Sequence, residues 1–276
     1  MSFLTLSDVS YQYPSGHLAV DRVNMSFAKG ESVAIIGQNG AGKTTTVKMM
    51  NGLLKPTDGN VIIDGWNTRE YTTAQLSRKV GYVFQNPDEQ IFHNDVYSEI
   101  EFGPKNLGLS EEQIKENVMR SAELTGVVPF LEENPYNLPY SMRKFVTIAS
   151  VLAMDSSVVI WDEPTAGQDL PAMKRLSDLI RILVQEGKTV ITITHDMEFV
   201  VNNFNRTIVM ANRQVLADGD KRDIFWDHDI LRQAKLKQPH ISRLCHSLNL
   251  DGKILTLQEL TRHLWQADTV TATNGK

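Results

Sequence analysis

GQNGAGKTT, residues 37–45, is the stretch that decides the fold of this chain. It fits the pattern G-x-x-x-x-G-K-[ST] and lies between a short apolar run, 33–36, and a helical pattern, 44–50. Glycines let backbone N–H groups converge on phosphate oxygens, and the start of a helix adds the positive end of its dipole. A strand, this loop and a helix in succession predict a P-loop that binds the phosphates of a nucleotide.

Two residues of the P-loop carry specific predicted roles. We expect Lys43 to reach the β- and γ-phosphates, and Thr44 to hold Mg²⁺. The predicted nucleotide-binding residues of the loop are Gly37, Gln38, Asn39, Gly40, Ala41, Gly42, Lys43, Thr44 and Thr45.

The composition excludes several classes of protein. With 276 residues, 41% of them hydrophobic, the chain can form a packed core. No run approaches the ~18 apolar residues of a membrane span, and the first residues predict no signal peptide. A single cysteine, Cys245, excludes an internal disulfide framework and favours a reducing compartment. The net charge of −5 argues against a nucleic-acid binder, and the histidines show no metal-ligand spacing.

Apolar periodicity along the chain predicts an α/β fold with a helical insertion. Helical patterns dominate from about 88 to 155, where Ser110 and Gln113 predict a capping box. We expect an α/β domain over 1–220, a helical subdomain over about 88–155, and a C-terminal helical segment over 221–276 with a flexible polar tail from Asp268. The predicted strands are 3–9, 23–27, 33–36, 60–63, 80–84, 158–161, 189–194, 206–210 and 214–217, and the predicted helices include 44–50, 110–124, one opening near 138, 173–185, 224–236 and 257–264.

Two acids follow the apolar run of VVIWDEP, residues 158–164. A buried strand would deliver Asp162 to its carboxyl end, where nucleotides bind in such sheets. We expect Asp162 to bind Mg²⁺ and Glu163 to orient and polarise the attacking water. The alternative is that both are solvated acids at a strand end.

Two further polar residues come directly after predicted strands. His195 follows 189–194, and Gln85 ends VGYVF. A histidine just beyond a strand is more often a packed or capping residue than a catalytic one, and a strand-end glutamine alone means little. Because the P-loop and the two acids occur in the same chain, we expect His195 to contact the γ-phosphate and Gln85 to sense that phosphate or Mg²⁺.

The order of these motifs resembles the ATP-binding subunit of ABC transporters over residues 1 to about 220. GQNGAGKTT resembles Walker A and VVIWD resembles Walker B, with Glu163 as the catalytic acid. Gln85 resembles the Q-loop glutamine, and His195 the switch histidine. TAGQD, residues 165–169, resembles the D-loop, with Asp169 as its aspartate. Tyr13 resembles the aromatic residue that stacks on adenine, with Tyr11 as its rival.

That resemblance implies an ATPase with ATP and Mg²⁺ as cofactors. It also implies a P-loop NTPase (RecA-like) core with an antiparallel β subdomain, a helical insertion subdomain and a small C-terminal helical extension.

A finer resemblance is to the energy-coupling factor (ECF) importers of vitamins and metal ions. It is carried by VFQNPDEQIF (83–92), the run 99–108, GLLKPTDGNVIIDG (52–65) and the segment after 220. The resemblance implies a dimer of ATPases at the cytoplasmic face of the membrane, under a transmembrane coupling subunit and with a separate substrate-binding membrane protein. It also implies that the C-terminal helical segment over 221–276 helps to hold the two ATPase subunits together. It also implies a groove beside the Q-loop, near Asp88, Glu89 and 92–104, that receives helices of the transmembrane coupling subunit. Carboxylates there, including Glu99 and Glu101, would pair with arginines of that subunit. The alternative is that these acids are merely solvated at the surface.

The segment NLPYSMRK, 137–144, departs from the family at the start of a predicted helix. That helix normally opens with Leu-Ser-Gly-Gly-Gln and binds the γ-phosphate held by the other subunit. Here Pro139 offers neither hydroxyl nor N–H, and Tyr140 puts a ring where the backbone must approach the phosphate. We call these five residues the signature, and we interpret it as degenerate: Leu138, Pro139, Tyr140, Ser141 and Met142. A heterodimer with a second ATPase follows as a hypothesis, with one competent and one weakened site.

Three alternatives remain open at this point. One is a soluble ABC protein that acts on ribosomes or DNA, although such proteins usually carry two ATPase domains or a long coiled coil. Another is a regulatory module that binds ATP without turnover, and a third is an ABC importer of a different group. The transported solute cannot be predicted, because the ATPase never touches it.

Overall fold

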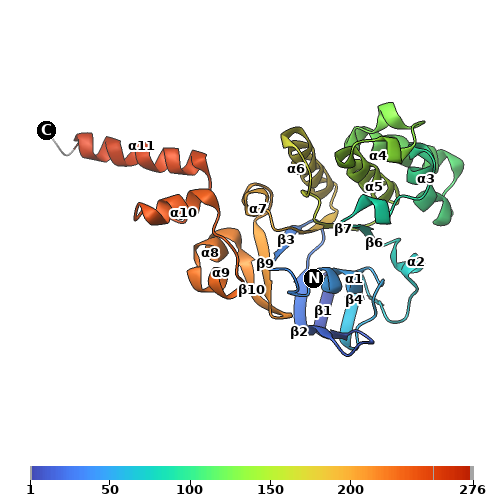
Figure 1. Ribbon diagram of the computed structural model, residues 1–276, viewed down its shortest axis with the longest axis horizontal. Helices are drawn as coiled ribbons and strands as arrows, with labels where there is room; N and C mark the ends of the chain where they lie inside the picture. Colours follow the sequence, from blue (N-terminus) through green and yellow to red (C-terminus); the bar gives the residue numbers. More distant parts are fainter. Residues whose placement is uncertain (1, 251, 274–276) are drawn as a thin grey trace.

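The computed structural model describes residues 2–250 and 252–273 and contains two sheets flanked by helices (Figure 1). The larger sheet has the strand order β10-β9-β3-β8-β7-β6, in which β3, β6, β7, β8 and β9 are parallel to one another and β10 pairs antiparallel with β9. Parallel neighbours bring their carboxyl ends to one edge, so the segments after β3, β6, β7 and β8 meet there. The strands are β3 (Ser32–Ile36), β6 (Val80–Val83), β7 (Val158–Asp162), β8 (Thr189–Ile193), β9 (Arg206–Ala211) and β10 (Gln214–Asp220).

The smaller sheet is antiparallel, with the order β2-β1-β4-β5. Its strands are β1 (Leu4–Gln12), β2 (Leu18–Phe27), β4 (Asp58–Ile63) and β5 (Trp66–Asn67). β1 and β2 are longer than the sequence predicts because Asp8 (φ 49°) and Arg22 (φ 46°) introduce register shifts that break the alternating pattern. The α/β architecture with an antiparallel β subdomain is confirmed.

Helices cover the large sheet and form the predicted helical insertion. The capping box at Ser110 and Gln113 is confirmed, because each side chain bonds the backbone of the other. The helices up to the last strand are α1 (Lys43–Met50), α2 (Thr73–Leu76), α3 (Val96–Asn106), α4 (Glu111–Thr125), α5 (Tyr140–Ala153), α6 (Leu170–Gln185) and α7 (Met197–Asn203), with 3-10 turns at Pro87–Glu89, Val128–Phe130 and Pro135–Asn137.

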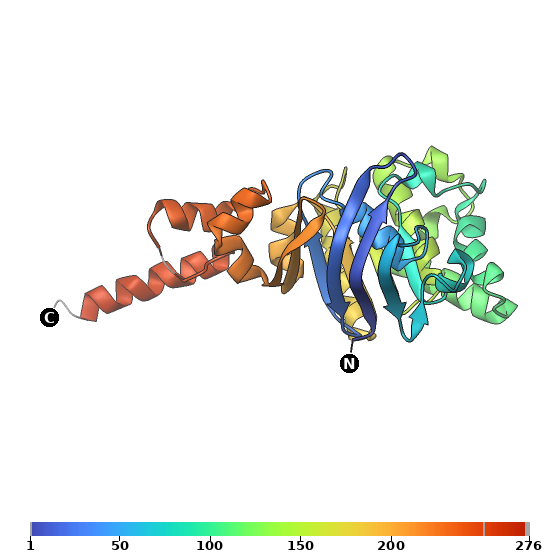
Figure 2. The same cartoon turned by 90° about the horizontal axis from the view of Figure 1, so that it is seen from below.

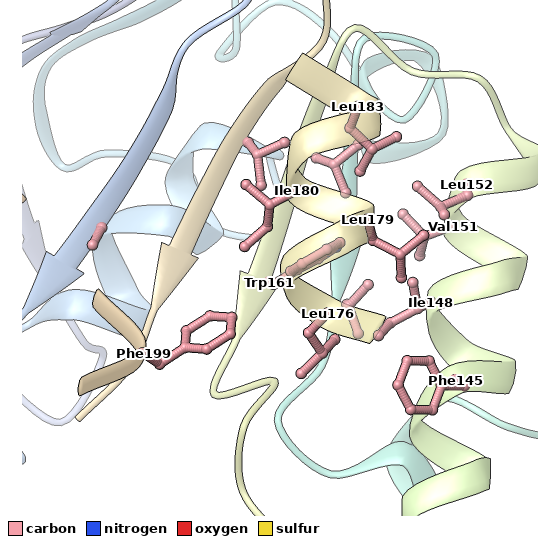
Figure 3. Packing of buried hydrophobic residues seen from close by; sticks show 14 of the residues in the cluster. Phe145, Ile148, Val151, Leu152, Trp161, Leu176, Leu179, Ile180, Leu183 and Phe199 are labelled. Atoms are coloured by element: carbon pink, nitrogen blue, oxygen red, sulfur yellow. The ribbon is translucent and has the colours of Figure 1, made fainter. Parts of the chain in front are cut away.

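The main core lies between the large sheet and helices α5 and α6 (Figure 3). Trp161 of β7 is its largest fully buried side chain and lies among Leu176 and Ile180 of α6 and Ile148 of α5. Its indole nitrogen has no hydrogen-bond partner among the described residues. Packing therefore holds Trp161 in place, directly before Asp162.

We expect Trp161→Ala to lower the free energy of unfolding by about 3–5 kcal/mol, because it leaves a large cavity. Trp161→Phe should cost less, since the ring is retained and the unpaired N–H is removed. Urea denaturation of the three proteins measures both values. Equal losses for the two variants would contradict this account of the core.

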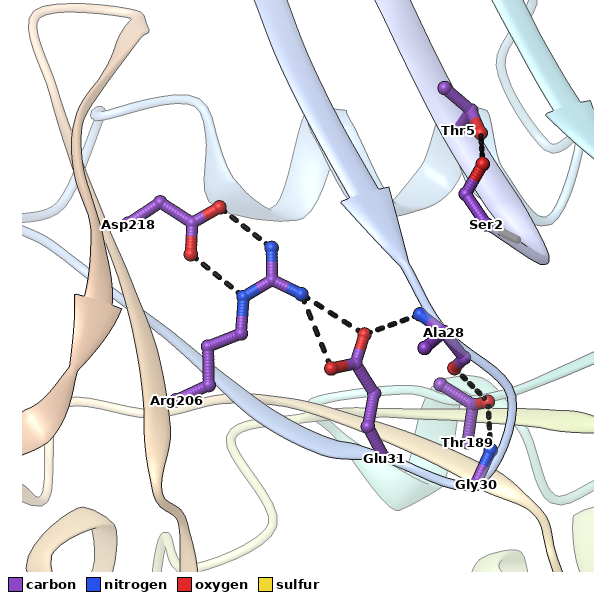
Figure 4. Close-up of polar contacts among 8 residues, drawn as sticks. All are labelled: Ser2, Thr5, Ala28, Gly30, Glu31, Thr189, Arg206 and Asp218. Carbon is purple, nitrogen blue, oxygen red and sulfur yellow. Dashed lines mark hydrogen bonds and ion pairs between the residues drawn. The ribbon is translucent and has the colours of Figure 1, made fainter.

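Arg206 joins the β9–β10 hairpin to the turn before β3 (Figure 4). Its guanidinium donates to both carboxylate oxygens of Asp218, at 2.8 and 2.7 Å, and to Glu31 at 3.0 Å. Nearby, the Thr189 hydroxyl donates to Ala28 O at 2.9 Å. These bonds fix the edge of the sheet that carries the C-terminal segment.

The C-terminal segment begins at α8, directly after β10, and leads away from the sheets (Figure 2). Its helices are α8 (Lys221–Trp226), α9 (His228–Gln233), α10 (His240–Ser247) and α11 (Leu257–Thr273). The single predicted helix 224–236 is wrong, because the Asp227 side chain accepts the N–H groups of Asp229 and Ile230 and starts a new helix. The predicted tail from Asp268 is also wrong up to Thr273, since no glycine or proline interrupts α11, and 274–276 lie outside the described residues. Within the described residues, no helix is both long and apolar enough to cross a membrane.

Candidate functional site

The P-loop connects β3 to α1 at the carboxyl edge of the sheet. At two of its glycines, Gly37 and Gly42, φ is positive and any side chain would clash with neighbouring backbone atoms. A Cβ on Gly37 would lie 2.2 Å from Met210 O, and one on Gly42 (φ 97°) would lie 2.6 Å from Ala19 O. The loop is therefore packed against β2 and β9 from outside, which leaves its backbone N–H groups to face a cavity.

Lys43 opens α1 and is only 7% exposed. Its ammonium donates to Gly37 O at 2.7 Å and to Gln38 O at 3.1 Å, so it closes the loop on itself. Burial lowers the pKa of Lys43, while the charges of Glu163 and Asp162 oppose this shift. The lysine is thus held over the loop, where a phosphate would replace these carbonyl contacts.

Asp162 ends β7 and is 1% exposed. The Tyr82 hydroxyl donates to its Oδ2 at 2.7 Å, and burial together with this carboxylate raises the pKa of Tyr82. The other oxygen, Oδ1, is buried and has no hydrogen-bond partner among the described residues. An unpaired buried carboxylate oxygen is an unfavourable arrangement unless a cation or water completes it. With the Thr44 hydroxyl on the same cavity, the donor set fits Mg²⁺, which prefers oxygen ligands.

Removing the Tyr82 hydroxyl should be costly, because Oδ2 of Asp162 would lose its partner in a buried site. We expect Tyr82→Phe to lower the free energy of unfolding by about 1–3 kcal/mol in the absence of Mg²⁺. Thermal or urea unfolding with and without Mg-ATP measures this. Tyr71→Phe is the control, because the half-buried Tyr71 ring stacks on Trp66 outside the cavity. Equal effects of the two changes would contradict the role given to Tyr82.

Glu163 follows Asp162 in a left-handed conformation (φ 49°), which points its carboxylate to the cavity side of the strand end. His195, at the end of the neighbouring strand β8, lies with Nδ1 2.9 Å from Glu163 Oε2, and its backbone N–H is 3.3 Å from the same oxygen. Burial raises the pKa of Glu163, and His195 and Lys43 oppose the rise. The sequence predicted a role for each residue but not this contact between them.

One cavity of 640 Å³ brings these groups together. His195 stands at its rim, with a side chain that is 70% exposed, and Gln85 lines it from the segment after β6. The predicted residues that line the cavity are Gly37, Gln38, Asn39, Gly40, Ala41, Gly42, Lys43, Thr44, Thr45, Gln85, Asp162, Glu163 and His195. The groups expected to bind phosphate, to bind the metal ion and to accept a proton therefore line one cavity.

The two candidate adenine-stacking tyrosines lie in different surroundings. The Tyr13 hydroxyl is 3.2 Å from Thr45 Oγ1, which places this ring beside the P-loop. Tyr11 packs against the core of the smaller sheet. The geometry favours Tyr13 over its rival.

The signature and the D-loop lie outside the cavity. Pro139 precedes α5 without a side-chain cap, and among the described residues the N–H groups of Tyr140 and Ser141 have no acceptor. The Tyr140 ring covers the D-loop, since a Cβ on Gly167 would meet it at 3.3 Å. Asp169 caps α6 by accepting the N–H of Ala172 at 2.9 Å.

The sequence reading missed the role of Lys144, which is fully buried in α5. Its ammonium donates to the carbonyl oxygens of Phe84, at 3.1 Å, and of Gln85. Burial lowers the pKa of Lys144 to about 8, while Asp162 and Glu163 oppose the shift. The available signal was its position four residues before Ile148, on the apolar face of the helix. Through Lys144, the helix that carries the signature is tied to the segment of Gln85.

Comparison with known proteins identifies the family of this chain. A sequence profile described as "ABC transporter" matches residues 20–166. A Pyrococcus furiosus protein, named as an ABC transporter ATP-binding protein, is 40% identical over 94% of this chain and 98% of its own length. The energy-coupling factor transporter ATP-binding protein EcfA of Methanothermobacter thermautotrophicus is 38% identical over 90% of this chain and 81% of its own. The structure of CbiO1 from Clostridium perfringens, part of the ABC transporter complex CbiONQ, has a TM-score of 0.75 and 31% identity over 90% of this chain and 99% of that one.

Proposed function

Because this chain belongs to the ABC transporter ATP-binding family, and is an ATPase of the energy-coupling factor type, we propose that it energises an importer of a vitamin or metal ion as one half of a heterodimer. The observation that carries the proposal is the combination of a complete cavity with a degenerate signature. Lys43, Asp162 and Glu163 face one space, while α5 opens with Pro139 and Tyr140.

In this proposal different residues of the chain bind the phosphates, accept the proton of the attacking water and position the accepting carboxylate during ATP hydrolysis. The P-loop N–H groups and Lys43 bind the phosphates and offset the charge that develops on them. Glu163 orients the attacking water and accepts its proton, and a raised pKa suits a base. His195 holds the Glu163 carboxylate through the 2.9 Å contact and is exposed enough to turn toward the terminal phosphate.

Mg²⁺ would be held by Asp162 Oδ1 and the Thr44 hydroxyl, with Gln85 beside them, and when bound it neutralises phosphate charge. Tyr82 keeps Asp162 in one orientation, so that only Oδ1 is left for the ion.

The start of α5 makes the proposed assembly asymmetric. A helix start can bind a phosphate through its free N–H groups, and those of Tyr140 and Ser141 are available. The serine hydroxyl is missing at Pro139, however, and a tyrosine ring, which packs against Gly167 of the D-loop, replaces the glycine at position 140. The partner's ATP would therefore meet a weaker site here, while ATP bound to this chain depends on the partner's signature.

A second cavity, of 230 Å³, supports docking to a membrane subunit. It is mainly apolar, and Phe92, 58% exposed, and Phe102 stand at its edge with ring centroids 4.7 Å apart. Exposed aromatic side chains beside a groove are typical anchors of a protein interface. We propose that coupling helices of the transmembrane subunit dock here.

The interpretation of nearby carboxylates as partners for arginines needs a correction. Asp88 is paired with Arg143 at 2.6 Å, and Glu101 is paired with Lys105. Glu99 is buried and accepts two backbone N–H groups of 92–93. Asp88, Glu99 and Glu101 are thus paired within the chain, whereas Glu89 is exposed and forms no ion pair among the described residues. Glu89 therefore remains the candidate for pairing with an arginine of the partner, beside the apolar contact of the groove.

We expect Phe92→Asp to weaken binding to the coupling subunit at least about tenfold, because buried aromatic anchors dominate such interfaces. Val128→Asp, on a 3-10 turn outside the groove, should leave it unchanged. Co-purification in mild detergent and titration of the soluble pair onto reconstituted membrane subunit measure the effect. Equal binding of the two variants would contradict the assignment of the groove.

The wider proposal is tested by identifying what co-purifies with the full chain in mild detergent. A multi-span coupling subunit together with a second ATPase is the expected result. Recovery of ribosomes or DNA instead would favour the soluble class of ABC protein.

A further inference from the structure

The cavity has a wall that the ATPase motifs do not account for. Lys235, Leu236 and Lys237, from the turn between α9 and α10, line it together with His195 and Met197. This turn belongs to the C-terminal segment, which Figure 1 places beside β10 and α7. Part of the segment after β10 therefore faces the space proposed for ATP.

Contacts on both sides fix this turn. Before it, the Leu236 N–H bonds Leu231 O at 2.9 Å, and the Leu236 side chain packs on the main core. After it, the His240 N–H donates to Glu198 Oε1 at 2.7 Å. Glu198 lies in the first turn of α7, which begins two residues after His195. The turn is thus tied to the helix that directly follows His195.

The turn presents two lysines whose charges are not used within the chain. Lys235 and Lys237 are both exposed, and neither has an ion-pair partner among the described residues. Lys235 occupies a left-handed conformation (φ 53°), a position at a helix end where glycine is the usual residue. A lysine ammonium is a compact charge on a flexible stem, so it can follow an anionic ligand.

We propose that Lys235 and Lys237 bind the polyphosphate of the nucleotide, so that the C-terminal segment forms part of the ATP site. The inference deepens the proposed function and rests on ATP occupying this cavity. The two lysines supplement Lys43, which faces the carboxylates of Asp162 and Glu163. Nucleotide binding would also fasten the C-terminal segment to α7 through the contact of His240 with Glu198.

The test is the affinity of the full chain for ATP and for AMP, measured by calorimetry at two salt concentrations. The double variant Lys235→Gln, Lys237→Gln should bind ATP about 10- to 30-fold more weakly than the unmodified chain, as loss of two partly screened charged contacts implies. Binding of AMP should change much less, and the salt dependence of ATP binding should decrease. Lys174→Gln, an exposed lysine of α6 outside the cavity, is the matched control and should have no effect.

Lys43→Ala separates failure of the inference from failure of the proposed site. If Lys43→Ala weakens ATP binding about a hundredfold while the double variant binds ATP as the unmodified chain does, the inference is overturned and the proposed site is retained. Equal losses for ATP and AMP would also overturn it, because the lysines would not be acting on the polyphosphate. If Lys43→Ala binds ATP with the affinity of the unmodified chain, both the proposed ATP site and the inference are contradicted.

Discussion

Glu163→Gln is expected to lower the ATP turnover of the reconstituted pair at least about a hundredfold. A positioned general base contributes roughly 10²–10⁴-fold to such a reaction, and an amide cannot accept the proton. The geometry is preserved, because glutamine has the same shape and can still bond His195 across the 2.9 Å contact. Phosphate release measured under saturating Mg-ATP gives the result.

The proposed asymmetry of the pair should make this loss nearly complete. In the proposed heterodimer the partner's ATP would face Pro139 and Tyr140, so the other site should not replace the lost activity. ATP affinity should stay within about twofold, since Glu163 is not a phosphate ligand in this account. Glu112→Gln, an exposed acid of α4, is the control and should retain full turnover. Substantial turnover by the Glu163→Gln pair would show that the second site is competent after all.

Lys43→Ala is expected to raise the dissociation constant for ATP about a hundredfold. The ammonium already forms two bonds to P-loop carbonyls and would exchange them for phosphate oxygens. Charged hydrogen bonds contribute about 1.5–3 kcal/mol each, and every 1.4 kcal/mol is a factor of ten in affinity. Titration with a fluorescent ATP analogue measures the loss.

The same helix supplies the control for Lys43. Lys48 lies in the last turn of α1, 6.0 Å from the Phe84 ring centroid and outside the cavity. Lys48→Ala should bind ATP as the unmodified chain does. ATP binding by Lys43→Ala at the unmodified affinity would mean that the P-loop does not hold the phosphates.

The P-loop, the Walker B strand and the order of elements could be predicted because each depends on a few adjacent residues. The required glycines, the apolar run before Asp162 and the cap of α4 act within one turn or strand. The comparisons confirm the family that these motifs indicated. The residues 10–12 of β1 and 18–22 of β2 were not predicted as strand, because the irregularities at Asp8 and Arg22 hide the alternating pattern.

Contacts between distant segments could not be predicted in the same way. Tyr82 and Asp162 lie 80 residues apart, and only the pairing of β6 with β7 brings them together. The apolar face of α5 indicates that Lys144 is buried, but its bond to the carbonyl oxygen of Phe84 depends on how α5 packs against the segment after β6. The turn with Lys235 reaches the cavity because α8 and α9 pack on the core, which no local pattern reveals.

The central claim is that this chain has a full set of hydrolysing groups and presents a weakened signature to its partner. The most direct measurement is ATP turnover by the chain alone, at concentrations that allow it to dimerise, against turnover by the pair. We expect near-background turnover alone and robust turnover with the second ATPase. Restoring the signature by Pro139→Ser, Tyr140→Gly, Ser141→Gly and Met142→Gln should let the chain hydrolyse ATP by itself. Robust turnover by the unmodified chain alone would contradict the claim.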